Sequence, residues 1–169
     1  FEINHIEKLI TQYFSNIIKS DIPIQRPFIP VPDHDETLFA IASDPEASYS
    51  NVNLIHKFEP NTDRASISAF RDGIIFNLYN GILGNRLDEL TKAADPPFLF
   101  ARSRKGSWVQ SKEMYTLSAY VKTNGIPRGM ESLLTETIRV KKHGFTQSEL
   151  DRQKTKYLRN LEKQYNERN

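Results

Sequence analysis

The chain has 169 residues, 38% of them hydrophobic and 11% aromatic, which is enough for one domain with a packed core. Its 23 basic and 21 acidic residues leave a formal charge of +2, too small to indicate nucleic-acid binding. No run approaches the roughly 18 apolar residues of a membrane span, and the lack of cysteine excludes disulfides, thiolate catalysis and cysteine zinc sites. Because the chain opens without an initiator Met or signal peptide, we interpret residues 1–169 as a single domain cut from a larger chain.

The N-terminal part of the chain predicts a helix followed by an extended arm. Ile6, Leu9 and later apolar residues recur at spacings of three and four, which predicts a helix over residues 3–18. Four of the nine prolines fall in residues 21–35. Proline favours extended geometry and cannot donate to a strand ladder, so we expect this segment to lie as an arm over the surface.

Two strands are predicted next. Residues 37–42 are short and apolar, which is typical of an inner strand. Residues 50–59 alternate between apolar and polar side chains, which predicts a strand with one buried face. His56 lies on the apolar face of this strand, so we expect it to be a hydrogen-bonded core residue rather than a metal ligand.

The longest pattern runs from Asp63 to Ala101 and joins a helix to a strand. Its apolar positions follow helical spacing and predict one buried stripe, made of Ile67, Phe70, Ile74, Leu78, Ile82, Leu87 and Leu90. Asp63 stands just before the stripe as the expected N-cap. Pro96 and Pro97 cannot continue a helix, so the strand that follows is the expected packing partner.

The second half of the chain predicts a hairpin and two helices. Residues 98–104 and 114–122 have the composition of strands with turn-forming residues between them, so we expect an antiparallel hairpin. A helix begins at Pro127 and ends at Gly144, and a capping box over residues 146–149 starts a last, charged helix. This order predicts the α+β class, with an antiparallel sheet and helices packed on one face as a two-layer sandwich.

No catalytic or metal-binding constellation is visible in these patterns. The histidines, which are His5, His34, His56 and His143, form no His-x-x-Glu-His motif. Asp33-His34-Asp35-Glu36 is the densest group of ligand-type residues, but its place after the arm is typical of a solvated turn. The chain has neither a glycine-rich phosphate loop nor a Gly-x-Ser-x-Gly nucleophile elbow.

Two basic clusters could meet a phosphate or an acidic peptide. They are Arg102-Ser103-Arg104-Lys105 and Lys141-Lys142-His143. We interpret both as solvated edges, because basic residues on an edge strand also discourage unwanted pairing. Trp108 follows the first cluster, and its spacing fits either a core residue or a contact surface.

Three motifs together resemble a known family. They are the helix end Ile-Leu-Gly-Asn-Arg-Leu-Asp-Glu-Leu at 82–90 with Pro-Pro-Phe-Leu-Phe-Ala at 96–101, the helix with Ile6, Tyr13 and Phe14, and the capping box at 146–150. In this order they resemble the second domain of pitrilysin/insulinase-type zinc metallopeptidases, in a form most similar to bacterial, periplasmic members. The resemblance covers nearly all of the chain.

The resemblance implies a hydrolase whose chemistry lies outside this chain. In that family repeated α+β domains enclose a chamber, and a preceding domain binds zinc through an inverted His-x-x-Glu-His motif with a glutamate as general base. No catalytic, cofactor-binding or metal-binding residue is therefore expected here, and zinc is expected in the parent protein. The family's substrate-gripping Arg and Tyr correspond to about Thr91 and Phe100, which keep neither polar group.

We therefore expect a non-catalytic domain that shapes a chamber around a peptide or protein substrate and docks against other domains of its parent chain. Its expected location is the periplasm or cell envelope of a bacterium. Two alternatives stay open at this stage. One is a structural, inactive processing-peptidase-like subunit, whose upstream zinc motif would be degraded. The other is an independent peptide-binding module that uses the hairpin from Arg102 to Trp108 and binds in a salt-sensitive manner.

Overall fold

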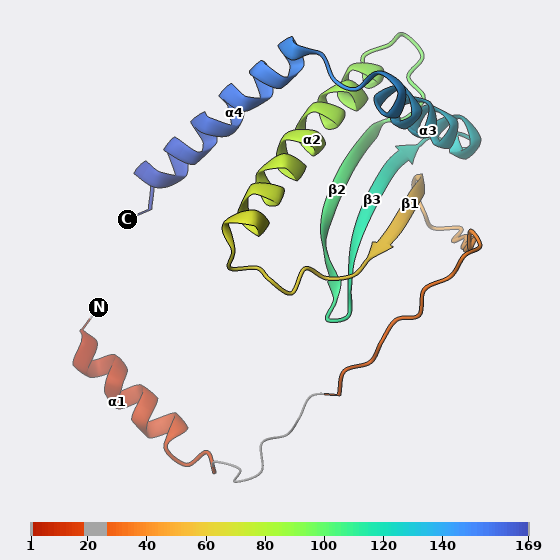
Figure 1. Ribbon diagram of the computed structural model, residues 1–169. Coiled ribbons are helices and arrows are strands. Elements are labelled where there is room, and N and C mark those ends of the chain that lie inside the picture. Colours follow the sequence, from red (N-terminus) through yellow and green to blue (C-terminus); the bar gives the residue numbers. More distant parts are fainter. Residues whose placement is uncertain (1, 19–26, 169) are drawn as a thin grey trace.

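The computed structural model describes residues 2–18 and 27–168 (Figure 1). Its elements follow in the order α1 (Ile3–Phe14), β1 (Ser50–Phe58), α2 (Ile67–Thr91), β2 (Phe100–Val109), β3 (Lys112–Val121), α3 (Ile126–His143) and α4 (Gln147–Asn166). The strands form an antiparallel sheet of order β1-β3-β2, with β3 in the centre. The predicted α+β class is confirmed.

The core lies between one face of the sheet and helices α2 and α3. Alternate residues of β3 point into it, and α2 packs on β2 while α3 packs on β3 and β1. The buried cluster consists of Leu83, Leu87, Phe98, Ala101, Leu117, Ala119, Val121 and Leu133. Gly129 lets α3 approach closely, because a Cβ at this position would lie 2.6 Å from Cγ1 of Val121.

The hairpin of β2 and β3 is confirmed. The strands pair through Ala101 and Ala119 near one end and through Val109 and Lys112 at the other, where the turn lies. The ladder shifts register between Ser107 and Val109, which is a bulge next to the turn. The predicted bounds differ from the structure, because the first strand continues five residues further and the second begins two residues earlier. Leu117, Ala119 and Val121 form the face of β3 that packs into the core.

Most of the helix ends follow the sequence signals. Gly144 ends α3 with φ 68°, a backbone conformation that suits glycine, and its N–H donates to the carbonyl of Val140. The capping box that starts α4 is confirmed, because the N–H of Glu149 donates to Oγ1 of Thr146 and the N–H of Thr146 donates to Oε2 of Glu149.

The expected N-cap of α2 is wrong. Ser66 caps the helix, and its Oγ accepts from the N–H of Ala69 at 3.1 Å. Asp63 lies three residues earlier, where its N–H donates to the Asn61 side chain. Any of several polar residues before an apolar stripe can serve as a cap, and the sequence alone does not distinguish them.

The predicted stripe of α2 is only partly buried. Ile82 and Leu87 are buried, whereas Ile67 and Phe70 are 87% and 69% exposed. The helix packs most tightly in its C-terminal half, where Leu83 is fully buried, and its contact with the sheet reaches back to Phe76. The first turns of the stripe, with Ile67 and Phe70, therefore lack a partner among the described residues, whereas Ile74 and Leu78 are half-buried.

Two predictions for the first half of the chain are wrong. Residues 37–42 form no strand, and Phe39 and Ile41 are 81% and 96% exposed, because an apolar run becomes a strand only when another strand pairs with it. His56 is exposed and meets the Phe58 ring edge-on at 4.6 Å rather than lying in the core. It follows Val52 and Leu54, which are the residues of β1 that pack against the core.

The predicted arm is extended in the part that the structure describes. Residues 27–35 contain neither helix nor strand, while residues 21–26 lie outside the described residues. The Ser111 hydroxyl donates to the carbonyl of Ile29 at 3.0 Å, and Nζ of Lys57 donates to the carbonyl of Pro32 at 2.6 Å. These bonds hold the arm against the turn end of the sheet.

Helix α1 is shorter than predicted and stands apart. It ends at Phe14, and among the described residues it packs against no other helix or strand (Figure 1). Its apolar stripe is exposed, with Tyr13 at 67% and Phe14 at 61%. No helix within residues 2–18 and 27–168 combines the length and apolar character needed to cross a bilayer.

Candidate functional site

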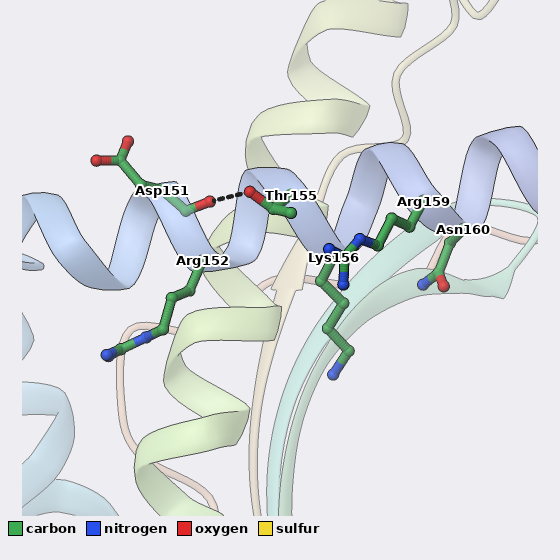
Figure 2. A pocket seen from close by; sticks show the side chains of 6 residues that line it. All are labelled: Asp151, Arg152, Thr155, Lys156, Arg159 and Asn160. Atoms are coloured by element: carbon green, nitrogen blue, oxygen red, sulfur yellow. Dashed lines mark hydrogen bonds between the residues drawn. The ribbon is translucent and has the colours of Figure 1, made fainter.

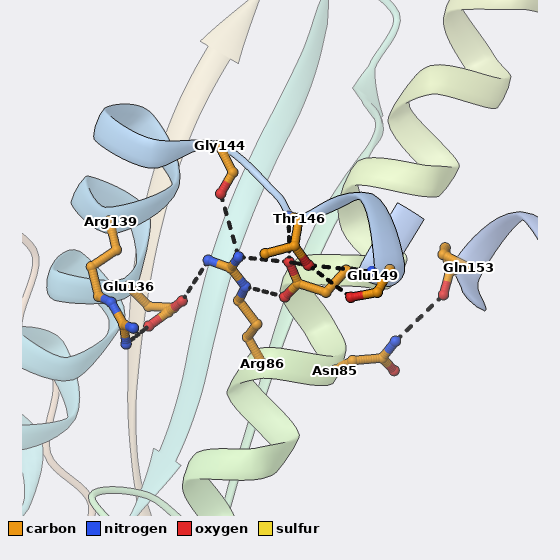
Figure 3. Close-up of polar contacts among 9 residues, drawn as sticks. Asn85, Arg86, Glu136, Arg139, Gly144, Thr146, Glu149 and Gln153 are labelled. Carbon is orange, nitrogen blue, oxygen red and sulfur yellow. Dashed lines mark hydrogen bonds and ion pairs between the residues drawn. The ribbon is translucent and has the colours of Figure 1, made fainter. Parts of the chain in front are cut away.

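Arg86 is the centre of a polar cluster that joins three helices (Figure 3). Its Nε and Nη2 donate to the two carboxylate oxygens of Glu149 at 2.6 and 2.8 Å, which is the bidentate geometry of strong ion pairs. Nη1 donates to Oε1 of Glu136 at 3.1 Å, and Nη2 also reaches the carbonyl of Gly144 at 3.3 Å. We call these four residues the Arg86 cluster.

The Arg86 cluster is largely shielded from water. The side chain of Glu136 is 4% exposed, and that of Glu149 is 16% exposed. The Arg86 hydrogen bond, assisted by the backbone N–H of Thr146, lowers the pKa of Glu149 to about 2. The same pairing raises the pKa of Arg86, whose guanidinium also lies 5.1 Å from the centre of the Phe145 ring.

This arrangement ties α2, α3 and α4 together through ion pairs. The second oxygen of Glu136 accepts from Nη1 of Arg139 at 3.0 Å, so every charge in the cluster has a partner. Both carboxylates are held in ion pairs with guanidinium groups, and the lowered pKa of Glu149 makes it a weak base. The sequence flagged Arg86 as a family marker, but nothing in the sequence indicated Glu136 as its partner.

The ligand-type cluster at 33–36 is engaged in holding the arm. Asp33 accepts two bonds from Nζ of Lys112, at 2.8 and 2.9 Å, and Glu59 also accepts from this nitrogen. This pairing lowers the pKa of Asp33 and raises that of Lys112, while Nδ1 of His34 lies 2.6 Å from the carbonyl oxygen of Glu36. Over residues 2–18 and 27–168 no three His, Asp or Glu side chains gather as a metal site would require.

The four histidines lie on separate parts of the fold. His5 is in α1, His34 in the arm, His56 in β1 and His143 in the last turn of α3. The second basic cluster is solvated as predicted, because Lys141, Lys142 and His143 are exposed in the last turn of α3. Cations at this place are favourable because they face the negative end of the helix dipole.

The first basic cluster is divided between the two faces of the sheet. Ser103 and Lys105 point toward α2, where Oγ of Ser103 donates to Oδ1 of Asn80 at 2.5 Å and Nζ of Lys105 lies 4.2 Å from the centre of the Phe76 ring. Arg102 and Arg104 are exposed on the other face. The prediction of a solvated edge is therefore correct for the arginines and wrong for Lys105.

Two positions, Thr91 and Phe100, correspond to the substrate-gripping residues of the family that the sequence resembles. They lie on different elements and make different contacts. Thr91 is the last residue of α2, and its hydroxyl donates to the carbonyl of Asp88 at 2.7 Å. Phe100 begins β2, is 53% exposed and lies tilted to Tyr120 with ring centres 6.2 Å apart. Trp108 is half exposed near the end of the same strand, as a contact surface would be.

One flank of α4 forms a cationic pocket (Figure 2). It is lined by Asp151, Arg152, Thr155, Lys156, Arg159 and Asn160 and has a volume of about 480 Å³. The Thr155 hydroxyl donates to the carbonyl of Asp151 at 2.9 Å, so it is engaged by its own helix. All the lining residues come from α4, and they provide charge but no nucleophile–base pair.

Comparison with known proteins finds a distant similarity to a zinc protease. A protein of Arabidopsis thaliana described as "Zinc protease PQQL-like" is 33% identical to this chain over 90 residues. The match covers 53% of the chain but 9% of that relative, so the chain matches about a tenth of its length. No family model and no solved structure matches the chain. The similarity supports a relationship to zinc proteases and is consistent with a fragment of a peptidase.

Proposed function

We propose that this chain is a non-catalytic domain of a zinc metallopeptidase of the pitrilysin/insulinase type. In this proposal it forms part of the wall of a chamber that encloses a peptide or protein substrate, and zinc is bound by an upstream His-x-x-Glu-His motif. The similarity to a zinc protease supports the chemistry of the parent.

The observation that carries the proposal is the apolar surface that the helices leave uncovered. In addition to α1, the N-terminal half of α2 exposes Ile67 and Phe70, and α4 exposes Leu158 and Tyr165. An exposed apolar area of this kind marks a contact with another protein surface. Neighbouring domains of the same parent chain are the partners that best explain it.

The test compares the isolated chain with its parent. The isolated chain should retain no stoichiometric zinc and cleave no peptide, while the parent should do both. The double variant L158K/L161K should leave the isolated chain folded, because these side chains are 58% and 42% exposed, but should lower peptidase activity of the parent at unchanged zinc content. The variant R152Q/R159Q, on the other flank of α4, is the matched control.

Two outcomes would change the assignment. One tight zinc per isolated chain would contradict a non-catalytic role. A parent with a degraded zinc motif and no activity would favour the alternative, a structural processing-peptidase-like subunit. Location in a bacterial periplasm or envelope stays a prediction, which a signal peptide at the start of the parent would support.

A further inference from the structure

The face of the sheet opposite α2 and α3 carries two exposed arginines that no described carboxylate on the same face neutralises. Side chains alternate between faces along a strand, so the residues that do not point toward α2 or α3 share this second face, which we call the open face. Among its positions in the three strands, the charged residues are Lys57, Arg102, Arg104 and Lys112. Lys57 and Lys112 lie at the turn end, where the arm engages both of them, so the arginines are the charges available for a ligand. No described helix packs against it (Figure 1).

The two arginines are unpaired and regularly spaced. Neither Arg102 nor Arg104 forms a side-chain hydrogen bond or ion pair within residues 2–18 and 27–168. They stand two residues apart on one strand, which places their Cα atoms about 6.7 Å apart. An extended peptide repeats at the same distance on each of its faces, so carboxylates at alternate positions would meet both guanidinium groups in register.

The centre of the open face is already partly shielded from water. Ser118, which pairs with Arg102 in the ladder, is 4% exposed although no helix covers it. Thr116 pairs with Arg104 in the ladder, and its Oγ1 is buried with no hydrogen-bond partner in the part of the chain that the structure describes. A charge pair is stronger over such a surface than in bulk water, because the neighbouring atoms reduce screening.

An aromatic group lies next to the arginines in the same row. Phe100 precedes Arg102 by two residues, and its ring lies 6.2 Å from that of Tyr120. Tyr49 meets Tyr120 edge-on at 5.2 Å. The row therefore offers one aromatic contact and two guanidinium contacts at equal intervals, which a peptide with one apolar and two acidic side chains at alternate positions would match.

We infer that the open face binds an extended acidic peptide segment with the pattern apolar-x-acidic-x-acidic. Each carboxylate accepts two bonds from one guanidinium, and the apolar side chain lies against Phe100 and Tyr120. The inference extends the proposed function by naming a class of substrate segment that the chamber wall would hold. It does not depend on the exposed apolar residues of α4, such as Leu158 and Tyr165.

The test measures binding of a labelled peptide to the isolated chain. The probe is rhodamine-labelled Phe-Thr-Glu-Thr-Glu, and the comparison peptide is Phe-Glu-Glu-Thr-Thr, which has the same composition but adjacent acids. Fluorescence anisotropy should show that the first peptide binds at least about fivefold more tightly and that its Kd rises with salt. Variant R102Q/R104Q should raise the Kd about tenfold or more, and R102K/R104K should raise it less, since lysine keeps the charge but not the bidentate geometry.

The control variant K141Q/K142Q removes the same charge from the end of α3 and should change the Kd less than twofold. Melting curves of all variants should match the native chain, because the substituted side chains are exposed. The inference would be overturned if R102Q/R104Q and K141Q/K142Q raised the Kd equally. Equal affinity of the native chain for the two peptides, or no binding at low salt, would also overturn it. Such a result would leave the zinc and activity measurements on the parent unaffected, so the two proposals fail separately.

Discussion

At the scale of single residues, the bond between Arg86 and Glu149 makes stability depend on acid pH. The pKa of Glu149 is about 2, against an ordinary value of 4.5. Because the folded-state pKa is depressed, the stabilisation is fully present above about pH 4.5 and is lost as the pH falls toward 2. At about 1.4 kcal/mol per unit, this pair contributes on the order of 3 kcal/mol at neutral pH.

The substitution Glu149→Gln tests this dependence. Urea unfolding should show a lower free energy of unfolding for the variant at pH 7 and a difference that shrinks steadily as the pH approaches 2. Glu131→Gln, on an exposed part of α3, should follow the native profile throughout. Parallel profiles for native chain and E149Q would show that the bond does not carry the acid dependence.

The sequence indicated Arg86 as part of a family motif but did not predict its contacts. The Thr146–Glu149 capping box is a local pattern, and it is confirmed because both partners lie within one helical turn. Arg86 meets Glu136 and Glu149 across 50 and 63 residues of chain. Only the packing of three helices brings these groups together, and no local spacing encodes that packing.

At the scale of elements, two helical glycines differ in the space around them. Gly129 lies where α3 packs closely on the sheet, and Gly84 lies where a side chain would have room. A Cβ at Gly129 would lie 2.6 Å from Cγ1 of Val121, a buried core atom, whereas a Cβ at Gly84 would meet nothing within 4 Å. Gly129→Ala should therefore push α3 from the sheet and lower the free energy of unfolding by about 1–3 kcal/mol. Gly84→Ala should raise it by about 0.5–1 kcal/mol, because alanine favours a helix. Thermal and urea unfolding of the pair measure both values, and the opposite order would contradict this packing.

An element was predicted correctly where the residues that determine it are close together in the sequence. The hairpin, both ends of α3 and the start of α4 were predictable, because turn residues, glycine stops and capping boxes act within a few residues. The strand at 37–42 failed for the opposite reason. Its apolar run satisfies the pattern of an inner strand, but β3 pairs with β1 on one side and β2 on the other, so the centre of the sheet is filled without it.

At the scale of the whole molecule, the apolar stripes of the helices predict more buried side chains than the described residues contain. The stripes of α1 and of the first half of α2 have the correct helical period, and yet Ile10 and Phe70 remain 54% and 69% exposed. A periodic stripe shows that one face of a helix is apolar and is stabilised by packing against an apolar surface. It does not show that this surface belongs to the same domain. The α+β class was predictable because it depends only on the order of elements.

Removal of α1 from the isolated chain tests this view of the molecule. Because α1 packs against no other described element, a chain that begins at residue 27 should unfold with the same midpoint and urea dependence as the full sequence. The variant L9K/F14K should likewise leave the isolated chain unchanged, since these side chains are 38% and 61% exposed. In the parent the same variant should lower stability or activity, because there the stripe would be covered by a neighbouring domain.

Lys8→Ala, on the polar side of the helix, is the control for both the isolated chain and the parent. A lower melting midpoint for isolated L9K/F14K would show that α1 packs on its own domain, and the uncovered surface would then shrink to that of α2 and α4.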